Sequence, residues 1–286
     1  MAYLEIRGVD KSFERTQRAA AEGSGRLPVL RNINLAIDEN EFVCIVGRSG
    51  SGKTTLISLI AGLLKPDLGK ILLEGKPIDG PGPDRGVVFQ NYSLLPWMNV
   101  FENVHLAVDA VAPDLAASQK RERAEHYIRL VNLGAAMKKV PRELSGGMRQ
   151  RVAVARGLAM DPKVLLMDEP FSALDALTRG TLQEELGRIW METRKTVVMI
   201  TNDIDEAILL ADSIYTLTSG TGATLGPAVR VETAHPRSRA ELNREASYQR
   251  VRRETVSILM REGKDSATGS ARNGKESYLT EEEPYR

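Results

Sequence analysis

The chain has 286 residues, 27% of them charged and 42% hydrophobic, which is enough to bury the core of one large or two small domains. Its 39 Lys and Arg nearly balance 38 Asp and Glu, and a net charge of +1 gives no electrostatic argument for a nucleic-acid partner. The single cysteine, Cys44, excludes an internal disulfide and fits a reducing cytoplasm.

The first half of the chain predicts strands that alternate with helices. Strand patterns occupy residues 3–14, 29–37, 42–46, 70–73 and 86–89. A helix is expected to begin near Gly52 and to end about Ala61, and from about residue 92 to 158 the pattern is helical and more polar. This succession indicates an α/β fold with a mostly parallel, covered sheet, into which a helical segment is inserted.

The second half resumes the α/β pattern. A strand at 164–167 precedes a helix at about 178–192 and a strand at 197–200. The final stretch, residues 263–286, is rich in Gly, Ser, Lys and Glu and has almost no core residues, which predicts a disordered tail. We therefore expect one folded unit, residues 1–262, in which a helical subdomain occupies about 91–160.

A glycine-rich loop follows the strand at 42–46. It satisfies G-x-x-x-x-G-K-[ST] between a predicted strand and a predicted helix, which is the context that this pattern requires. Glycines let backbone N–H groups close around phosphates, and the helix N-terminus adds partial positive charge. Lys53 would reach the β- and γ-phosphates, and the Thr54 hydroxyl would ligate Mg²⁺. The predicted nucleotide-binding residues of this loop are Gly47, Arg48, Ser49, Gly50, Ser51, Gly52, Lys53, Thr54 and Thr55.

Two adjacent carboxylates follow the strand at 164–167. That strand would carry Asp168 and Glu169 to its carboxyl end, beside the glycine-rich loop, where ligands bind in open α/β sheets. Taken alone, such a pair also fits a strand that ends at a polar turn. The phosphate-binding pattern in the same chain favours the functional interpretation.

Five motifs occur in a fixed order: the glycine-rich loop, Gln90, Leu144-Ser145-Gly146-Gly147-Met148, residues 167–170 and residues 172–175. A Leu-Ser-Gly-Gly segment upstream of an apolar-Asp-Glu segment narrows the interpretation to one family. Over roughly residues 1–220 the order resembles the ATP-binding-cassette (ABC) ATPases. The resemblance implies one cassette with an α/β P-loop NTPase core, a mostly parallel sheet, an antiparallel β-subdomain and the inserted helical subdomain.

The resemblance assigns roles at the phosphate site, with ATP as substrate and Mg²⁺ as its metal. Asp168 would help to hold Mg²⁺, commonly through water, and Glu169 would polarise the attacking water as general base. Gln90 would touch Mg²⁺ or that water and would link the core to the helical subdomain. The metal-binding set implied is Thr54, Gln90 and Asp168.

The phosphate site lacks a donor for the charge that builds on the γ-phosphate, although phosphoryl transfer depends on such stabilisation. In ABC proteins a second cassette supplies the donor in a head-to-tail dimer. Ser145-Gly146-Gly147 would open a helix here, with the Ser145 hydroxyl and free N–H groups facing the phosphate bound by the other chain. Asp175 would lie at the same interface between cassettes.

Two aromatic residues are candidates for contact with adenine, and one apolar run is a candidate for contact with a partner protein. Phe13, which ends the first strand, is the candidate to stack on adenine, with Tyr3 as the alternative. Leu94-Leu95-Pro96-Trp97 would be an unusual apolar patch on a monomer, and such patches mark interfaces. In transporters of the family a permease coupling helix docks in this region. The alternative is that these residues pack inside the helical subdomain.

One position departs from the family pattern. After the strand at 197–200 the family usually shows a switch histidine, where this chain has Asn202. Asparagine donates a hydrogen bond to a phosphate oxygen but is shorter and uncharged, so we expect weaker transition-state contact at this chain's own phosphate site. Either Asn202 suffices in a homodimer, or the chain pairs with a different cassette that keeps its histidine. We favour the second arrangement.

The cargo is indicated by resemblance alone. Residues 82–90 and 94–97 resemble the nitrate/sulfonate/taurine group of bacterial importers. The Thr201-Asn202-Asp203 departure and residues 217–220 and 223–225 are most similar to importers of nitrate and related anions. The resemblance implies an ATP-hydrolysing subunit of an importer for nitrate, or for nitrite, cyanate or bicarbonate. The alternatives are a sulfonate or taurine importer, and a weakly hydrolysing regulatory cassette in an unequal heterodimer.

Partners follow from the same resemblance. The longest apolar stretch near the glycine-rich loop, residues 57–64, is far shorter than the ~18 residues of a membrane-spanning helix, so a membrane role requires a partner. Permease subunits, a second cassette and, indirectly, an extracytoplasmic substrate-binding protein are implied, with the chain peripheral on the cytoplasmic face of the bacterial inner membrane. A soluble ABC ATPase for translation, repair or chromosome work is disfavoured by the single cassette, the lack of heptads and the net charge of +1.

Overall fold

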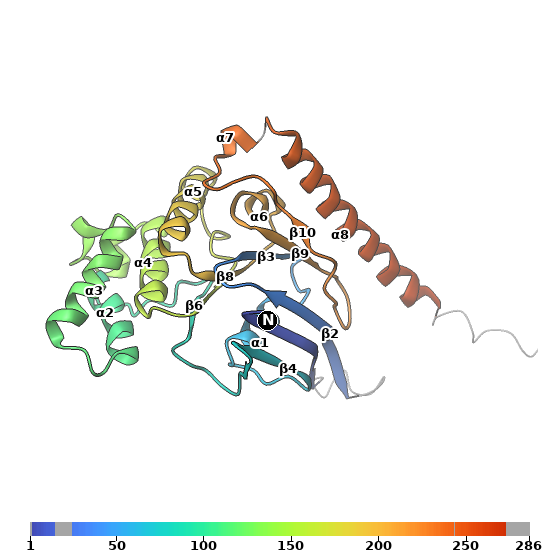
Figure 1. The fold of residues 1–286 in the computed structure, drawn as a ribbon, viewed down its shortest axis with the longest axis horizontal. Helices are drawn as coiled ribbons and strands as arrows, with labels where there is room; N and C mark the ends of the chain where they lie inside the picture. Colours follow the sequence, from blue (N-terminus) through green and yellow to red (C-terminus); the bar gives the residue numbers. More distant parts are fainter. Residues whose placement is uncertain (1, 15–24, 243, 273–286) are drawn as a thin grey trace, which may run out of the picture.

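The computed structural model describes residues 2–14, 25–242 and 244–272. The fold consists of two sheets, an inserted group of helices at one end and a long C-terminal helix on the other side (Figure 1). The strands are β1 (Leu4–Glu14), β2 (Arg26–Ile37), β3 (Phe42–Gly47), β4 (Leu68–Leu73), β5 (Lys76–Pro77), β6 (Arg85–Val88), β7 (Val164–Asp168), β8 (Thr196–Thr201), β9 (Ser213–Leu217) and β10 (Val229–Arg230). The α-helices are α1 (Lys53–Ile60), α2 (Val100–Val111), α3 (Ala117–Leu130), α4 (Gly146–Ala159), α5 (Ala176–Thr193), α6 (Ile204–Leu210), α7 (Arg239–Leu242) and α8 (Ala246–Arg272).

The central sheet has the strand order β10-β9-β3-β8-β7-β6. All neighbouring strands run parallel except β10, which is antiparallel to β9. Every residue of β3, β7 and β8 is buried, because helices and the second sheet cover both faces. The five parallel strands therefore end at one common edge.

The second sheet is antiparallel, in the order β2-β1-β4-β5, and lies against one face of the central sheet with α1 between them (Figure 1). Side chains alternate along β3, so Val43 and Ile45 pack toward this side while Phe42, Cys44 and Val46 pack toward the helices on the other side. The predicted combination of a mostly parallel sheet, an antiparallel β-subdomain and an inserted helical subdomain is confirmed.

The inserted helices α2, α3 and α4 lie at one end of the molecule (Figure 1). Asn99 starts α2 with a capping box: its side chain accepts from the Glu102 backbone, and the Glu102 side chain accepts from the Asn99 backbone. Val104 of α2 and Ile128 of α3 belong to the same buried cluster as Phe42 of the central sheet. The helical subdomain therefore shares its core with the sheet that carries the site.

Three helices begin at side chains that belong to the sequence motifs. Ser145 caps α4, Asp175 caps α5 and Asp203 caps α6, each by accepting a backbone N–H of the first turn. Capping fixes where each helix starts and so fixes the direction in which its free N–H groups point.

The C-terminal segment is anchored by Arg237, which is buried. Its guanidinium donates to the carbonyl oxygens of Ile208 (2.8 Å) and Ala211 (2.7 Å), at the carboxyl end of α6. Helix α8 follows, with Tyr248 and Val251 buried against the core, and passes beside α6, β9 and β10 (Figure 1). It continues through residues 263–272 of the stretch that composition predicts to be a disordered tail, whereas residues 273–286 lie outside the described part.

Within the described ranges, every helix is too short or too polar to span a bilayer.

Candidate active site

The common edge of the central sheet brings most of the predicted site residues together. The loop of residues 48–52 follows β3, Gln90 comes shortly after β6, Glu169 follows β7 and Asn202 follows β8. Ligands bind outside the carboxyl ends of strands in open α/β sheets because loops and helix N-termini converge there.

The phosphate loop is shaped by its last glycine. Gly52 has φ +94°, and a Cβ at this position would lie 2.9 Å from Cγ1 of Val29 in β2. Only glycine fits this close approach in the left-handed region. Ser51 is buried, and its Oγ has no hydrogen-bond partner among the described residues. An unpartnered donor within the loop fits a phosphate oxygen as ligand.

Lys53 connects the loop to the acidic pair. Its ammonium donates to the carbonyl oxygens of Gly47 and Arg48, both at 2.9 Å, and lies 3.2 Å from Oε1 of Glu169. The Lys53 side chain is only 4% exposed, so its charge is neutralised by these partners rather than by water. The Lys53 ammonium therefore lies between the phosphate loop and the Glu169 carboxylate.

Thr54 and Asp168 form the second contact across the site. The Thr54 hydroxyl donates to Oδ1 of Asp168 at 3.2 Å. Burial raises the pKa of Asp168 above its ordinary value, partly opposed by the hydrogen bond from Thr54, while the negative charge of Glu169 raises it further.

The donor set at this contact suits Mg²⁺. One hydroxyl and one carboxylate oxygen match a cation that takes few protein oxygens and completes its shell with water and phosphate. Throughout the described ranges no three His, Cys, Asp or Glu side chains cluster so as to hold a metal by themselves.

Glu169 has a strained backbone, with φ +43°, in the left-handed region that non-glycine residues seldom adopt. Its N–H donates to the Ile200 carbonyl at 3.0 Å, and its own carbonyl accepts the Ser172 hydroxyl at 2.9 Å. The Gln90 amide donates to the same Ser172 Oγ at 3.1 Å. Ser172, to which the sequence assigns no role, therefore links Gln90 to the backbone of Glu169.

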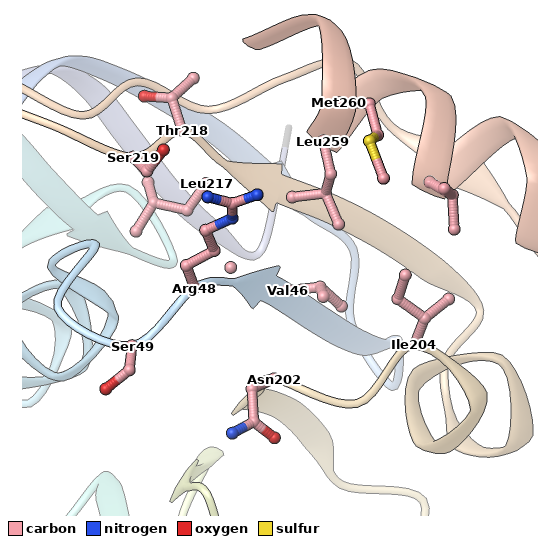
Figure 2. Close-up of a pocket in the computed structure, with 12 residues that line it drawn as sticks. Val46, Arg48, Ser49, Asn202, Ile204, Leu217, Thr218, Ser219, Leu259 and Met260 are labelled. Atoms are coloured by element: carbon pink, nitrogen blue, oxygen red, sulfur yellow. The ribbon is translucent and has the colours of Figure 1, made fainter. Parts of the chain in front are cut away.

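Asn202 is exposed between β8 and the Asp203 cap of α6. It lines one small cavity together with Glu169, Ser172 and Glu206. It also lines a larger cavity together with Arg48 at the start of the phosphate loop (Figure 2). Asn202 therefore borders both the phosphate loop and the acidic pair.

The two aromatic candidates lie at opposite ends of β1. Phe13 is 39% exposed, with Nζ of Lys11 5.5 Å from its ring centroid, and pairs with Leu27 of β2, two residues before the Val29 that Gly52 approaches. Tyr3 is half-buried and packs against the hydrophobic core at the far end. Phe13 is therefore the aromatic side chain on the phosphate-loop side of the sheet.

The signature segment lies apart from the phosphate loop of its own chain. Ser145 Oγ accepts from the Met148 N–H at 3.3 Å, which caps α4 ahead of Gly146. A Cβ on Gly147 would lie 2.6 Å from Cγ2 of Thr178, so α4 and α5 approach closely here. The cavity of about 300 Å³ beside Ser145 and Gly147 includes no residue of the phosphate loop. The chain therefore holds two half-sites that do not meet within it.

Asp175 lies next to that segment as the cap of α5. Its carboxylate accepts from the Thr178 N–H at 3.0 Å, and this hydrogen bond lowers its pKa below the ordinary value.

Sequence patterns do not predict one buried acidic neighbour of the site. Glu206 of α6 is buried, and it accepts from Nε2 of Gln183 at 2.6 Å. Burial raises its pKa to about 7, partly offset by hydrogen bonds from Thr201 and Gln183. Asp203-Ile204-Asp205-Glu206 has the pattern of an exposed first helical turn, so no signal in the sequence marks Glu206 as buried.

Comparison with known proteins identifies a family, two similar relatives and one similar solved structure. The ABC transporter family profile matches residues 30–172. The nitrate import ATP-binding protein NrtD of Synechococcus elongatus is 47% identical over 83% of this chain and 86% of its own length. The bicarbonate transport ATP-binding protein CmpC of the same organism is 48% identical over 90% of this chain, which spans only 38% of that relative. A dimeric post-hydrolysis state of the ATP-binding cassette MJ0796 bound to ADP and Pi has a TM-score of 0.68 at 30% identity, covering 81% of this chain and all of that one.

Proposed function

The chain belongs to the ABC transporter family, and on this premise we propose that it hydrolyses ATP to power a membrane importer of a small inorganic anion. The observation that carries the proposal is the buried contact of Lys53 with Glu169 at the edge where the phosphate loop ends. The similarity to a nitrate and to a bicarbonate transport subunit supports the anion as cargo.

The loop residues bind the phosphates of ATP. Backbone N–H groups at the start of α1 and the Ser51 hydroxyl donate to phosphate oxygens, and Lys53 exchanges its carbonyl partners for the β- and γ-phosphates. Thr54 and Asp168 would hold Mg²⁺, which neutralises phosphate charge when bound. On the phosphate-loop side of β1, the Phe13 ring would stack on adenine.

Glu169 acts as the general base. It orients the attacking water and accepts its proton while the bond between the γ-phosphorus and the bridging oxygen breaks and ADP leaves. The strained backbone of Glu169 is held by Ile200 on one side and by Ser172 on the other, which fixes the direction of the carboxylate. Gln90 and Asn202 complete the contacts around the water and the γ-phosphate.

A second cassette completes the site. The N-terminus of α4, with Ser145 and Gly147, would face the γ-phosphate bound by the other cassette and stabilise its developing charge. Because this chain has Asn202 where a histidine is usual, its own phosphate site would be the weaker one in a pair with a histidine-bearing cassette. Replacing Asn202 by His should raise turnover by about three- to tenfold, the equivalent of one hydrogen bond.

The permease would dock beside the Gln90 segment. A cavity of about 400 Å³ lies between the core and the helical subdomain, with Leu63, Phe89 and Met160 in its wall. Trp97 nearby in sequence is 72% exposed, whereas Leu94 packs in part against the helical core. An apolar coupling segment of a permease fits this surface, and it would hold the chain at the cytoplasmic face of the membrane.

Two experiments test the function. Nitrate uptake by vesicles that contain the complete transporter should require ATP and this chain, and should be competed by nitrite; uptake of bicarbonate in place of nitrate would reassign the cargo. Steady-state ATP hydrolysis by the chain alone, with Mg²⁺, should rise more than linearly with protein concentration if two copies form the site. Binding of ATP without turnover would instead place the second half-site on a different cassette.

A further inference from the structure

We propose that Gln183 of α5 and Glu206 of α6 are positioning residues for ATP hydrolysis, because their buried contact holds Asn202 beside the γ-phosphate. The inference rests on the proposed function, in which Asn202 contacts the γ-phosphate. It adds a role for two buried side chains to which the proposed function assigns none.

Gln183 and Glu206 meet between two helices. Gln183 is fully buried and Glu206 is 3% exposed. Nε2 of Gln183 donates to Oε2 of Glu206 at 2.6 Å. Stability alone does not explain this pair, since apolar side chains of the same shape would hold α5 against α6 about as firmly.

Arg239 of α7 fixes the orientation of the Gln183 amide. Nη2 of Arg239 donates to Oε1 of Gln183 at 2.6 Å, and the Arg239 N–H donates to Oε1 of Glu184 at 3.2 Å. A guanidinium group only donates hydrogen bonds, so the amide oxygen of Gln183 faces Arg239 and its nitrogen faces Glu206. The carboxyl group of Glu206 therefore has a donor in a fixed place.

Glu206 carries this contact to the end of β8. The Thr201 hydroxyl forms a hydrogen bond with the Glu206 carboxyl group, and Oγ1 of Thr201 accepts the Asp203 N–H at 3.0 Å. Oδ1 of Asp203 in turn accepts the N–H groups of Asp205 (2.9 Å) and Glu206 (3.1 Å). The residue on each side of Asn202 is therefore tied to the first turn of α6.

Asn202 depends on these two neighbours for its position. It stands in the short segment between β8 and α6 and is exposed (Figure 2). Its side chain makes no hydrogen bond to any other residue that the structure describes, so its amide can bind a phosphate oxygen. A displacement of about 1 Å in a group that contacts the transition state can slow a reaction by about 100-fold, so the anchoring of this segment matters for turnover.

The same contact lies beside the general base. Glu206 and Asn202 line one small cavity together with Glu169, and Arg179 of α5, one turn before Gln183, lines it as well. The position of Asn202 relative to Glu169 therefore depends on how α5 packs against α6.

The first test separates turnover from binding in the complete transporter. Gln183→Met keeps the length of the side chain but removes its N–H donors and its strong acceptor. We expect kcat for ATP to fall about tenfold while KM and ATP affinity stay within about twofold, because Asn202 acts on the γ-phosphate in the transition state. Thr193→Val, which removes a side-chain hydrogen bond at the far end of the same helix, is the matched control and should leave kcat unchanged.

The outcomes of this test separate the inference from the proposed function. An unchanged kcat for Gln183→Met, in a transporter whose natural chain hydrolyses ATP, would overturn the inference and leave the proposed function standing. Absence of ATP hydrolysis with the natural chain would overturn the proposed function and the inference together.

The second test exchanges the two partners. Gln183→Glu alone places two carboxyl groups against each other and should lower kcat about tenfold. Adding Glu206→Gln restores one amide and one carboxyl group in the reverse order, with Arg239 beside the new carboxylate, and should return kcat to within about threefold of the natural value. A loss of turnover that the exchange does not rescue would count against a specific contact and overturn the inference.

The third test asks whether the contact acts through Asn202. In an Asn202→Ala background, Gln183→Met should no longer lower kcat, because the positioned amide is absent. A tenfold loss of kcat in both backgrounds would overturn the inference, since the contact would then support the fold without positioning Asn202.

Discussion

The phosphate half-site and the signature half-site differ in how many contacts their key side chains make within the chain. The phosphate half is densely connected: Lys53 is buried and contacts Gly47, Arg48 and Glu169 within 3.2 Å. In the signature half Ser145 makes one hydrogen bond of 3.3 Å, and Leu177 nearby is 87% exposed. Neighbouring parallel strands assemble a binding site within one chain, whereas a helix N-terminus at the surface presents its donors to another molecule.

The largest effect is expected from Glu169→Gln in the phosphate half. The amide keeps the size of the side chain but accepts no proton, so turnover should fall by about 10²- to 10⁴-fold while ATP still binds. Phosphate release by the complete transporter and nucleotide titration of the same variant check this expectation. Full activity would refute the assignment of the general base.

Lys53→Ala should affect binding rather than chemistry alone. Removing the ammonium eliminates charge-assisted hydrogen bonds to phosphate worth about 1.5–3 kcal/mol, so ATP affinity should fall by about 10- to 100-fold. Isothermal titration of the isolated chain gives the affinity directly. Lys76→Ala, on the exposed strand β5, serves as the control, and an unchanged affinity for Lys53→Ala would contradict the phosphate-loop assignment.

Glu206, a buried carboxyl group beside the phosphate half, should make the stability of the chain depend on pH. Its folded pKa of about 7 exceeds the ordinary value of 4.5, mainly through burial. The folded chain therefore keeps a proton that the unfolded chain has released, and the free energy of unfolding should fall as the pH rises from about 4.5 to 7.

Glu206→Gln should remove this dependence. The variant should match the natural chain near pH 4.5 and exceed it above pH 7 by a free energy of unfolding on the order of 2 kcal/mol. Urea denaturation across this range measures the difference. Glu122→Gln, at an exposed position on α3, should show no such pH dependence. Parallel curves for the Glu206 variant and the natural chain would show that Glu206 does not stay protonated in the fold.

Ser145→Ala tests the signature half of the site. Loss of the α4 cap should lower the free energy of unfolding by about 1 kcal/mol and should leave the ATP affinity of the isolated chain unchanged. In the complete transporter the same variant should slow turnover, because the missing hydroxyl faces the phosphate of the other cassette. A loss of ATP affinity in the isolated chain would show that the two halves are not separate.

Most of the fold follows from local patterns in the sequence. The strand at 42–46, the glycine-rich loop and the helix after it correspond closely to β3 and α1, because a buried parallel strand and a loop of this type are encoded by consecutive residues. The predicted strands at 164–167 and 197–200 likewise match β7 and β8 within a residue at each end. The order of strands in the sheet is not encoded in this way, since it depends on packing between segments far apart.

The rest of the site depends on such packing. Glu206 is buried because Gln183, 23 residues earlier on α5, lies against it. The cavity of about 470 Å³ beside Arg48 and Asn202 requires α8 to lie near the start of the phosphate loop, and nothing local in the polar C-terminal sequence predicts that position. The strained φ of Glu169 likewise depends on a distant segment, because the Glu169 N–H donates to the Ile200 carbonyl of β8.

The placement of the two tryptophans has a practical consequence. Trp190 is 3% exposed, and its indole N–H donates to the Lys195 carbonyl at 2.8 Å, whereas Trp97 is 72% exposed beside the surface proposed for the permease. With only these two indoles in the chain, intrinsic fluorescence separates into a protected and a quenchable component. Acrylamide quenching of the red-shifted component would then report docking of the permease, and the blue component would report unfolding, without any label.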